Sequence, residues 1–422
     1  MHGDTQLVAT IAISLAAAFA GGLIAARLGL PTIVGYLLAG VVVGPFTPGF
    51  VADPGIATQL AEIGVILLMF GVGMHFSVAD LLAVRRLAVP GALGQIVVAT
   101  ALGLAIAWAW GWSPGEGLVF GLALSVASTV VLLRALEERG GVRTDEGRLA
   151  VGWLLVEDIV MVVVLVVLPE LAGWLGGSTP SAGGALVTDL ALTLGKLIGF
   201  VALMLVVGRR VVPMLLTWAE RLGAHDLFVL AVLATALGIA YGAAEIFGVS
   251  VALGAFLAGV AVNGSDLSHR AAEHAIPLQE AFAVLFFVSV GMLIDPAILV
   301  DRWAAIVVVT AVIVLGKALA AFAIVTIAGR PARTGLTVAA GLAQIGEFSF
   351  ILAELGRSLG LLSAEAQSLV LAGALVSITL NPFVMRSIDR TTRWIEARPR
   401  LERIARGREA SAGPAQAGRS SR

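Results

Sequence analysis

The sequence predicts an all-α polytopic membrane protein with thirteen transmembrane helices, and three observations carry this prediction. Of the 422 residues, 59% are apolar and only 13% are charged, whereas an average soluble protein has about 25% charged residues. The apolar residues gather in runs of about 20 residues, the length that a helix needs to cross a hydrocarbon core of roughly 30 Å. The fifty glycines suit membrane helices, because small residues let neighbouring helices approach closely.

Thirteen apolar runs are separated by charged residues, glycines and prolines, and we interpret each as one span. The first ten residues, MHGDTQLVAT, carry no basic segment ahead of the first run, so we expect a retained helix and not a cleaved signal peptide. The predicted spans are 6–26, 31–49, 56–74, 87–111, 116–135, 147–171, 185–208, 226–243, 247–263, 277–294, 302–328, 334–356 and 365–386.

The composition excludes several classes of function. The net charge of -1 provides no field that would attract nucleic acid, and we predict no nucleic-acid partner. The absence of cysteine excludes disulfides, thiolate metal sites and catalytic thiols. No soluble Gly-rich nucleotide fingerprint, intramembrane His pair or HExxH motif occurs in the chain, so we expect neither a nucleotide site nor an enzyme, and no cofactor.

Basic residues fix the expected orientation of the spans. Arginines cluster in the loops on the carboxyl-terminal side, and ten of them follow from Arg386 onward, whereas the opposite side carries only Arg302 and Arg357. By the positive-inside rule we expect an inner (cytoplasmic) membrane location, with the amino terminus outside and the carboxyl terminus in the cytoplasm. The Arg-rich tail at 391–422 is expected to be disordered.

An internal repeat links the two halves of the chain. GYLLAGVVVGP at 35–45 is answered by GAFLAGVAVNG at 254–264, and EIGVILLMFGVGM at 62–74 by EAFAVLFFVSVGM at 280–292. A weaker match joins 121–133 to 341–353. The offsets are all close to 219 residues and correspond to seven spans, so equivalent helices run in opposite directions, as in the inverted repeats of secondary transporters. We expect the two Gly-rich segments at 35–45 and 254–264 to contact each other in a fixed scaffold.

Polar residues at mid-depth mark the fifth and twelfth spans. Such repeats place the substrate site near the midplane, in helices that are unwound where the halves meet. Polar groups there can replace the backbone partners lost on unwinding, although Ser and Thr also occur in intact membrane helices, and both interpretations stay open here. The residues concerned are Ser125, Ser128 and Thr129 in the fifth span and Gln344 and Glu347 in the twelfth.

Three charged residues inside apolar runs carry the strongest chemical signal. Glu157 and Asp158 interrupt the sixth span, where a carboxylate costs on the order of 3 kcal/mol. Lys317 lies well inside the eleventh span, and we expect it to pair with Asp158. A buried ion pair without a transport role is the alternative, but intramembrane acids are usually functional.

A proton and a metal cation that compete for one carboxylate can be exchanged without covalent chemistry. Alkali cations prefer oxygen ligands. Asp158, together with the hydroxyls of Ser128 and Thr129 and with freed carbonyls, could supply them. We therefore predict Asp158 as the monovalent cation and proton site, with Glu157 beside it.

Several motifs together resemble the monovalent cation:proton antiporter superfamily, and within it the Kef-type potassium:proton antiporters of the YbaL-like branch. They include EIGVILLMFGVGMHFS, GWLLVEDIVMVV and LAQIGEFSFILAELG, and the likeness runs from about residue 7 to residue 386. The resemblance implies two broken helices that cross, a binding role for Asp158 and a charge-partner role for Lys317. It also implies a homodimer built from a dimerisation part (about 1–80 and 226–300), a linker helix (about 185–213) and a core transport part (about 87–175 and 302–388).

Two departures from the resembled family concern the ion and the chain length. Relatives carry Asp-Asp, Asn-Asp or Gln-Asp where this chain has Glu157-Asp158. Kef-type chains usually continue into a cytoplasmic nucleotide-binding regulatory domain, which these 422 residues do not contain. From the intramembrane acids and the resemblance together, the function that we favour is exchange of K⁺, or alternatively Na⁺, for H⁺. A cation channel or a ligand-gated K⁺ efflux pathway is the alternative, but no repeated selectivity-filter loop supports it.

Overall fold

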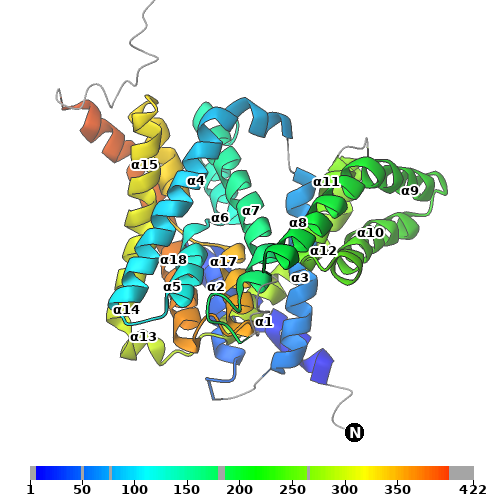
Figure 1. The fold of residues 1–422 in the computed structure, drawn as a ribbon, viewed down its shortest axis with the longest axis horizontal. Coiled ribbons are helices and arrows are strands. Elements are labelled where there is room, and N and C mark those ends of the chain that lie inside the picture. Colours follow the sequence, from blue (N-terminus) through cyan, green and yellow to red (C-terminus); the bar gives the residue numbers. More distant parts are fainter. Residues whose placement is uncertain (1–5, 49–51, 76–77, 179–185, 264–266, 399–422) are drawn as a thin grey trace, which may run out of the picture. The chain divides into compact units, whose positions relative to one another are not determined.

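A computed structural model describes residues 6–48, 52–75, 78–178, 186–263 and 267–398, and its helices form two compact units (Figure 1). The first unit contains Met1–Ser77 and Val162–Asp301, and the second contains Val78–Met161 and Arg302–Arg422. Helix α7 (Asp145–Leu171) begins in the second unit and ends in the first. Most of the predicted disordered tail, from residue 399, lies outside the described residues.

The first unit is held together by close helix packing at glycines. A Cβ on Gly259 would collide with the carbonyl of Phe70, so α11 and α3 can meet only because this residue is glycine. The expected contact between the two Gly-rich repeat segments is not among the main helix contacts of this unit, since α2 packs on α1 and α12, and α11 packs on α3 and α10. The helices are α1 (Gln6–Arg27), α2 (Thr32–Val43), α3 (Pro54–His75), α8 (Leu186–Leu203), the π-helix η1 (Met204–Gly208), α9 (Arg209–Arg221), α10 (His225–Phe247), α11 (Val251–Asn263), α12 (Ser268–Met292) and α13 (Ile298–Asp301).

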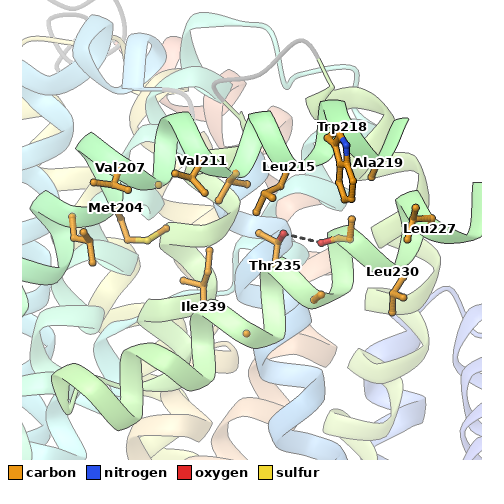
Figure 2. A pocket seen from close by; sticks show the side chains of 16 residues that line it. Met204, Val207, Val211, Leu215, Trp218, Ala219, Leu227, Leu230, Thr235 and Ile239 are labelled. Carbon is orange, nitrogen blue, oxygen red and sulfur yellow. Dashed lines mark hydrogen bonds between the residues drawn. The ribbon is translucent and has the colours of Figure 1, made fainter. Parts of the chain in front are cut away.

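An apolar groove of about 500 Å³ lies between the η1–α9 segment and α10 (Figure 2). Its walls are aliphatic apart from Trp218 and Thr235, and the Thr235 hydroxyl donates to the carbonyl of Ala231 at 2.7 Å. No charged side chain lines it. The groove therefore has no ligands for an ion.

The second unit brings together α4 (Val78–Ala109) and α15 (Lys317–Ile327), which run side by side (Figure 1). A buried cluster that includes Trp153 of α7 and Val325 of α15 forms its core. The other helices are α5 (Pro114–Ser125), α6 (Thr129–Glu138), α14 (Trp303–Ala311), the π-helix η2 (Val312–Gly316), α16 (Ala332–Leu342), α17 (Glu347–Ser358) and α18 (Ala364–Glu396).

Two helix pairs of the second unit are interrupted in mid-sequence. Residues 126–128 separate α5 from α6, and residues 343–346 separate α16 from α17, with a bend of 44° at the second interruption. Val126 and Ser128 have extended backbone angles, as does Gly346. Each interruption leaves backbone N–H and C=O groups that need other partners.

Each of the thirteen predicted spans overlaps at least one helix of the described residues, but the helices differ in length. Among the described residues, ten helices are long and apolar enough to cross a membrane, or eleven when the bent pair α16–α17 counts as one span. The remaining two, α2 and α11, have 12 and 13 residues. Helix α4 begins nine residues before the predicted start at 87 and α18 continues past 386 to Glu396. Backbone hydrogen bonds continue through charged turns that a hydropathy pattern treats as loop.

Candidate functional site

The buried charges of the protein are concentrated in the second unit. Among the described residues, four charged side chains are less than 4% exposed, namely Glu157, Asp158, Lys317 and Glu347. All four were predicted from the sequence, and they come from α7, α15 and α17. Burying so many ionisable groups is costly unless each has hydrogen-bond or charge partners. Those partners define the site.

Ser128 joins the two interruptions and caps a helix. It is the N-cap of α6, and its Oγ accepts from the N–H of Val131 at 3.3 Å. The same hydroxyl donates to Oε2 of Glu347 at 3.0 Å. Both hydrogen-bonding functions are thus in use, which leaves Ser128 Oγ less available as a cation ligand than its position in the sequence suggests.

Gln344 ties the second interruption to the first with a reciprocal pair of hydrogen bonds. The N–H of Ser128 donates to Oε1 of Gln344 at 3.0 Å, and Nε2 of Gln344 donates to the carbonyl of Ser128 at 3.1 Å. The Ser349 hydroxyl adds a bond to the carbonyl of Val126 at 3.3 Å. The approach is so close that a Cβ on Gly346 would collide with the Cα of Ser128. Side chains from one interruption therefore satisfy the freed backbone of the other.

Asp158 is 3% exposed and contacts the first interruption. The Thr129 hydroxyl donates to its Oδ2 at 3.1 Å. Its Oδ1 has no hydrogen-bond partner in the described part of the chain. Glu347 and Glu157 are both electrostatic neighbours of like sign. Asp158 thus combines an open oxygen with two adjacent acids.

Glu157 faces a different set of partners, because consecutive residues of a helix point about 100° apart. Its Oε2 accepts the N–H of Ala127 at 2.9 Å, inside the first interruption. Its carboxylate interacts electrostatically with Lys317 and with the indole N–H of Trp153 one turn earlier. Oε1 of Glu157 makes no regular hydrogen bond among the described residues.

The expected pairing of Lys317 with Asp158 differs from what the structure contains. No ion pair joins these two described residues, and the acid that interacts with the ammonium is Glu157. Lys317 Nζ donates instead to the backbone carbonyl of Gln344 at 2.9 Å. The π-helix η2 ends directly before Lys317, and such a segment changes the direction in which the following side chains point. A sequence pattern does not reveal that change.

The site has more negative than positive groups. The site holds three acids, Glu157, Asp158 and Glu347, and one ammonium, so it would carry a formal charge of -2 if all four groups were ionised. Such a charge is not stable away from water. Protons or bound cations must therefore neutralise part of this charge.

The sequence prediction missed two buried amides and misjudged one hydroxyl. Gln95 Nε2 donates to the carbonyl of Ser125 at 3.0 Å, and Asn381 Nδ2 donates to the carbonyl of Ala340 at 2.8 Å. Both amides bind carbonyls near the ends of interrupted helices. The sequence feature that could have indicated them is a single amide side chain within an apolar run. The Ser125 hydroxyl donates to the carbonyl of Leu122 in its own helix at 2.7 Å and not to any of the site acids.

Relatives of known family match nearly the whole chain. The sodium/hydrogen exchanger transmembrane family matches residues 14–388. YbaL of Escherichia coli (strain K12), named as a candidate cation/proton antiporter, is 55% identical over 391 residues, which are 92% of this chain and 70% of YbaL. K(+) efflux antiporter 4 of Arabidopsis thaliana is 32% identical over 387 residues, or 91% of this chain and 64% of that protein.

A solved structure shares the fold. The sodium proton antiporter MjNhaP1 of Methanocaldococcus jannaschii superposes with a TM-score of 0.68 at 17% identity, covering 91% of this chain and 99% of that one. This likeness concerns the fold, whereas the family match and the 55% identity concern descent. The chain therefore belongs to the sodium/hydrogen exchanger family of multi-pass membrane proteins, which are cation/proton antiporters.

Proposed function

We propose that this chain exchanges a monovalent cation, with K⁺ favoured over Na⁺, for H⁺ by alternating access, and that Asp158 holds the two substrates in turn. The K⁺ preference rests on the relatives that are named as K⁺ efflux antiporters, of which the chain matches 64% of the length. The coupling of cation transport to proton transport follows from competition, because a single carboxylate can bind either the cation or the proton but not both at once.

The observation that carries this proposal is the environment of Asp158. The side chain is buried, accepts the Thr129 hydroxyl and keeps Oδ1 open. The adjacent acids Glu347 and Glu157 make full ionisation without a bound cation costly. A site of this kind exchanges cation for proton whenever it opens to a new solution. Asp158 and Thr129 hold the cation in this proposal, and Glu157 and Lys317 set the charge balance.

The wider architecture of the proposal follows the family resemblance. The two interrupted helix pairs are the crossing helices, and α2 and α11 complete a set of thirteen spans. The core part (about 87–175 and 302–388) carries Asp158 from one membrane face to the other against a dimerisation part (about 1–80 and 226–300), joined by a linker at about 185–213. Two copies form a homodimer in the inner membrane, with the carboxyl terminus in the cytoplasm.

Reconstitution in liposomes tests the exchange. The purified chain is inserted into vesicles that hold a pH-sensitive dye and an imposed pH gradient, and K⁺, Na⁺ or Li⁺ is added outside at equal ionic strength. We expect K⁺ to dissipate the gradient at the lowest concentration, and Asp158→Asn vesicles to serve as the blank. Equal responses to all three cations would contradict the K⁺ preference. A cation current without proton movement would contradict the antiporter proposal and favour a cation channel.

A further inference from the structure

The buried amide of Gln95 lies in α4, and nothing in the sequence analysis or the proposed mechanism uses it. Its side chain is fully buried, and Nε2 donates to the carbonyl of Ser125 at 3.0 Å. Ser125 is the last residue of α5, so the accepting carbonyl is one that the interruption leaves without a helical partner. Gln95 thus holds the chain at the point where the first interruption begins.

Lys317 makes the corresponding contact in the second repeat. It is also fully buried, and Nζ donates to the carbonyl of Gln344, within the second interruption. The two accepting residues are 219 positions apart, which is the offset of the internal repeat. The two donors are 222 positions apart, and each ends a similar tetrapeptide, ALGQ at 92–95 and VLGK at 314–317.

The helices that carry the two donors occupy equivalent places. Helix α4 packs on α5, the first half of its interrupted pair, and α15 packs on α16, the first half of the other. The same arrangement therefore occurs twice: a donor helix packs on a short half-helix, and its donor binds a carbonyl at the interruption that follows. The difference between the copies is chemical, since the first donor is a neutral amide and the second is an ammonium.

The amide of Gln95 is not explained by stability alone. Its Oε1 is buried and has no hydrogen-bond partner in the described part of the chain. An unsatisfied buried acceptor costs about as much as one good hydrogen bond contributes. An apolar side chain of the same length would remove the cost at Oε1 but would leave the Ser125 carbonyl without its partner, so what Gln95 specifically provides is the position of that carbonyl.

We infer that Gln95 is a positioning residue of the cation site and is the neutral counterpart of Lys317. By fixing the carbonyl end of α5, it sets the place of residues 127–129, which carry the site contacts. The Ala127 N–H donates a hydrogen bond to Glu157, and the Ser128 N–H donates one to Gln344. The Thr129 hydroxyl donates to Asp158. This inference rests on the proposed exchange at Asp158.

The first test measures position directly. Gln95→Met keeps the length of the side chain but removes the donor. Hydrogen–deuterium exchange of the purified protein should show amides of 126–131 exchanging about fivefold faster or more, the equivalent of one lost hydrogen bond. The start of α5, at 114–120, should be unchanged. Gln367→Met is the matched control, because Gln367 is a buried glutamine of the same unit that bonds Glu354, away from either interruption.

The second test measures transport in the liposome assay. Gln95→Met should lower the exchange rate about fivefold or more, with a melting temperature like that of Gln367→Met. Gln95→Glu sharpens the test, because a carboxylic acid can donate to Ser125 O only while it is protonated. Its exchange relative to the native chain should therefore be restored toward acidic pH and lost toward alkaline pH, which a purely structural role would not produce.

The outcomes separate this inference from the proposed function. Unchanged amide exchange at 126–131 in Gln95→Met would overturn the positioning role, whatever the transport result. Faster amide exchange with native transport and a native pH profile would equally overturn it, since the site would not depend on this contact. Absence of cation-driven proton flux in the native chain would contradict the proposed function, while the amide exchange would still decide what Gln95 holds.

Discussion

The two units of the molecule have similar apolar helices but treat polar groups differently. Among the described residues, the first unit buries only three polar side chains, Thr10, Ser14 and Ser289, and none that is charged. The second unit buries two acids side by side on α7, a third on α17 and a lysine on α15. Membrane helices can be packed with small and apolar residues and almost no buried polar group, as the first unit is. The buried charges of the second unit therefore need an explanation beyond folding.

The comparison also separates two uses of glycine. In the first unit, Gly259 lets α11 approach α3 along regular helices. In the second unit, Gly346 lets two irregular backbones meet, next to Ser128. The first use stabilises a scaffold, and the second shapes a site. Substitutions should distinguish the two.

The largest effect is expected for Asp158→Asn. Asparagine keeps an oxygen for the Thr129 hydroxyl but neither titrates nor carries charge, so exchange should fall by about a hundredfold or more while the melting temperature changes little. Cation-dependent dye signals and detergent melting curves measure the two effects. Substantial cation-dependent proton flux in this variant would contradict the idea that the buried charges of the second unit carry the substrates.

Gly346→Ala should follow in size and tests the two uses of glycine. The added Cβ collides with the Cα of Ser128, and an overpacked contact of this kind costs about 1–3 kcal/mol. Exchange should fall by about tenfold or more in the protein that remains folded. Gly259→Ala, with a similar collision in the first unit, should lower stability while the folded fraction keeps its pH profile. Equal loss of transport per folded molecule in both variants would remove the distinction.

Much of this arrangement could be predicted from the sequence, for identifiable reasons. Glu157, Asp158, Lys317 and Glu347 stand out because charge in an apolar run is costly, and the repeat predicted two similar helices at mid-depth. The partner of Lys317 could not be predicted, because it depends on the rotation of α7 and on the π-helix before Lys317. Gln95 was missed because a lone neutral amide costs less to bury than a charge, and its partner, the Ser125 carbonyl, lies 30 residues away in the sequence.

Replacing Lys317 should separate its two contacts. Lys317→Ala removes both the hydrogen bond to the Gln344 carbonyl and the positive charge that interacts with Glu157, and losing a buried hydrogen bond from a charged donor costs about 2 kcal/mol. Lys317→Gln can still donate to the carbonyl, so its melting temperature should fall less. Both variants lack the positive charge that favours ionised acids, so the exchange profile should move to more alkaline pH. Melting and pH profiles that match the native chain would exclude both contacts from any role.

Glu157→Gln should have the smallest effect on rate and the clearest effect on charge. Glutamine keeps an oxygen that can accept the Ala127 N–H, so the first interruption should hold its shape and the exchange rate should change by less than about fivefold. The variant leaves Lys317 without the acid that faces it, so the net charge of the loaded site rises by one. Transport currents measured together with dye-reported proton flux should therefore show a changed charge moved per proton. If this variant were as inactive as Asp158→Asn, the substrates would be held by the pair of acids, and the second unit would contain one shared site in place of a binding acid and a charge-balancing one.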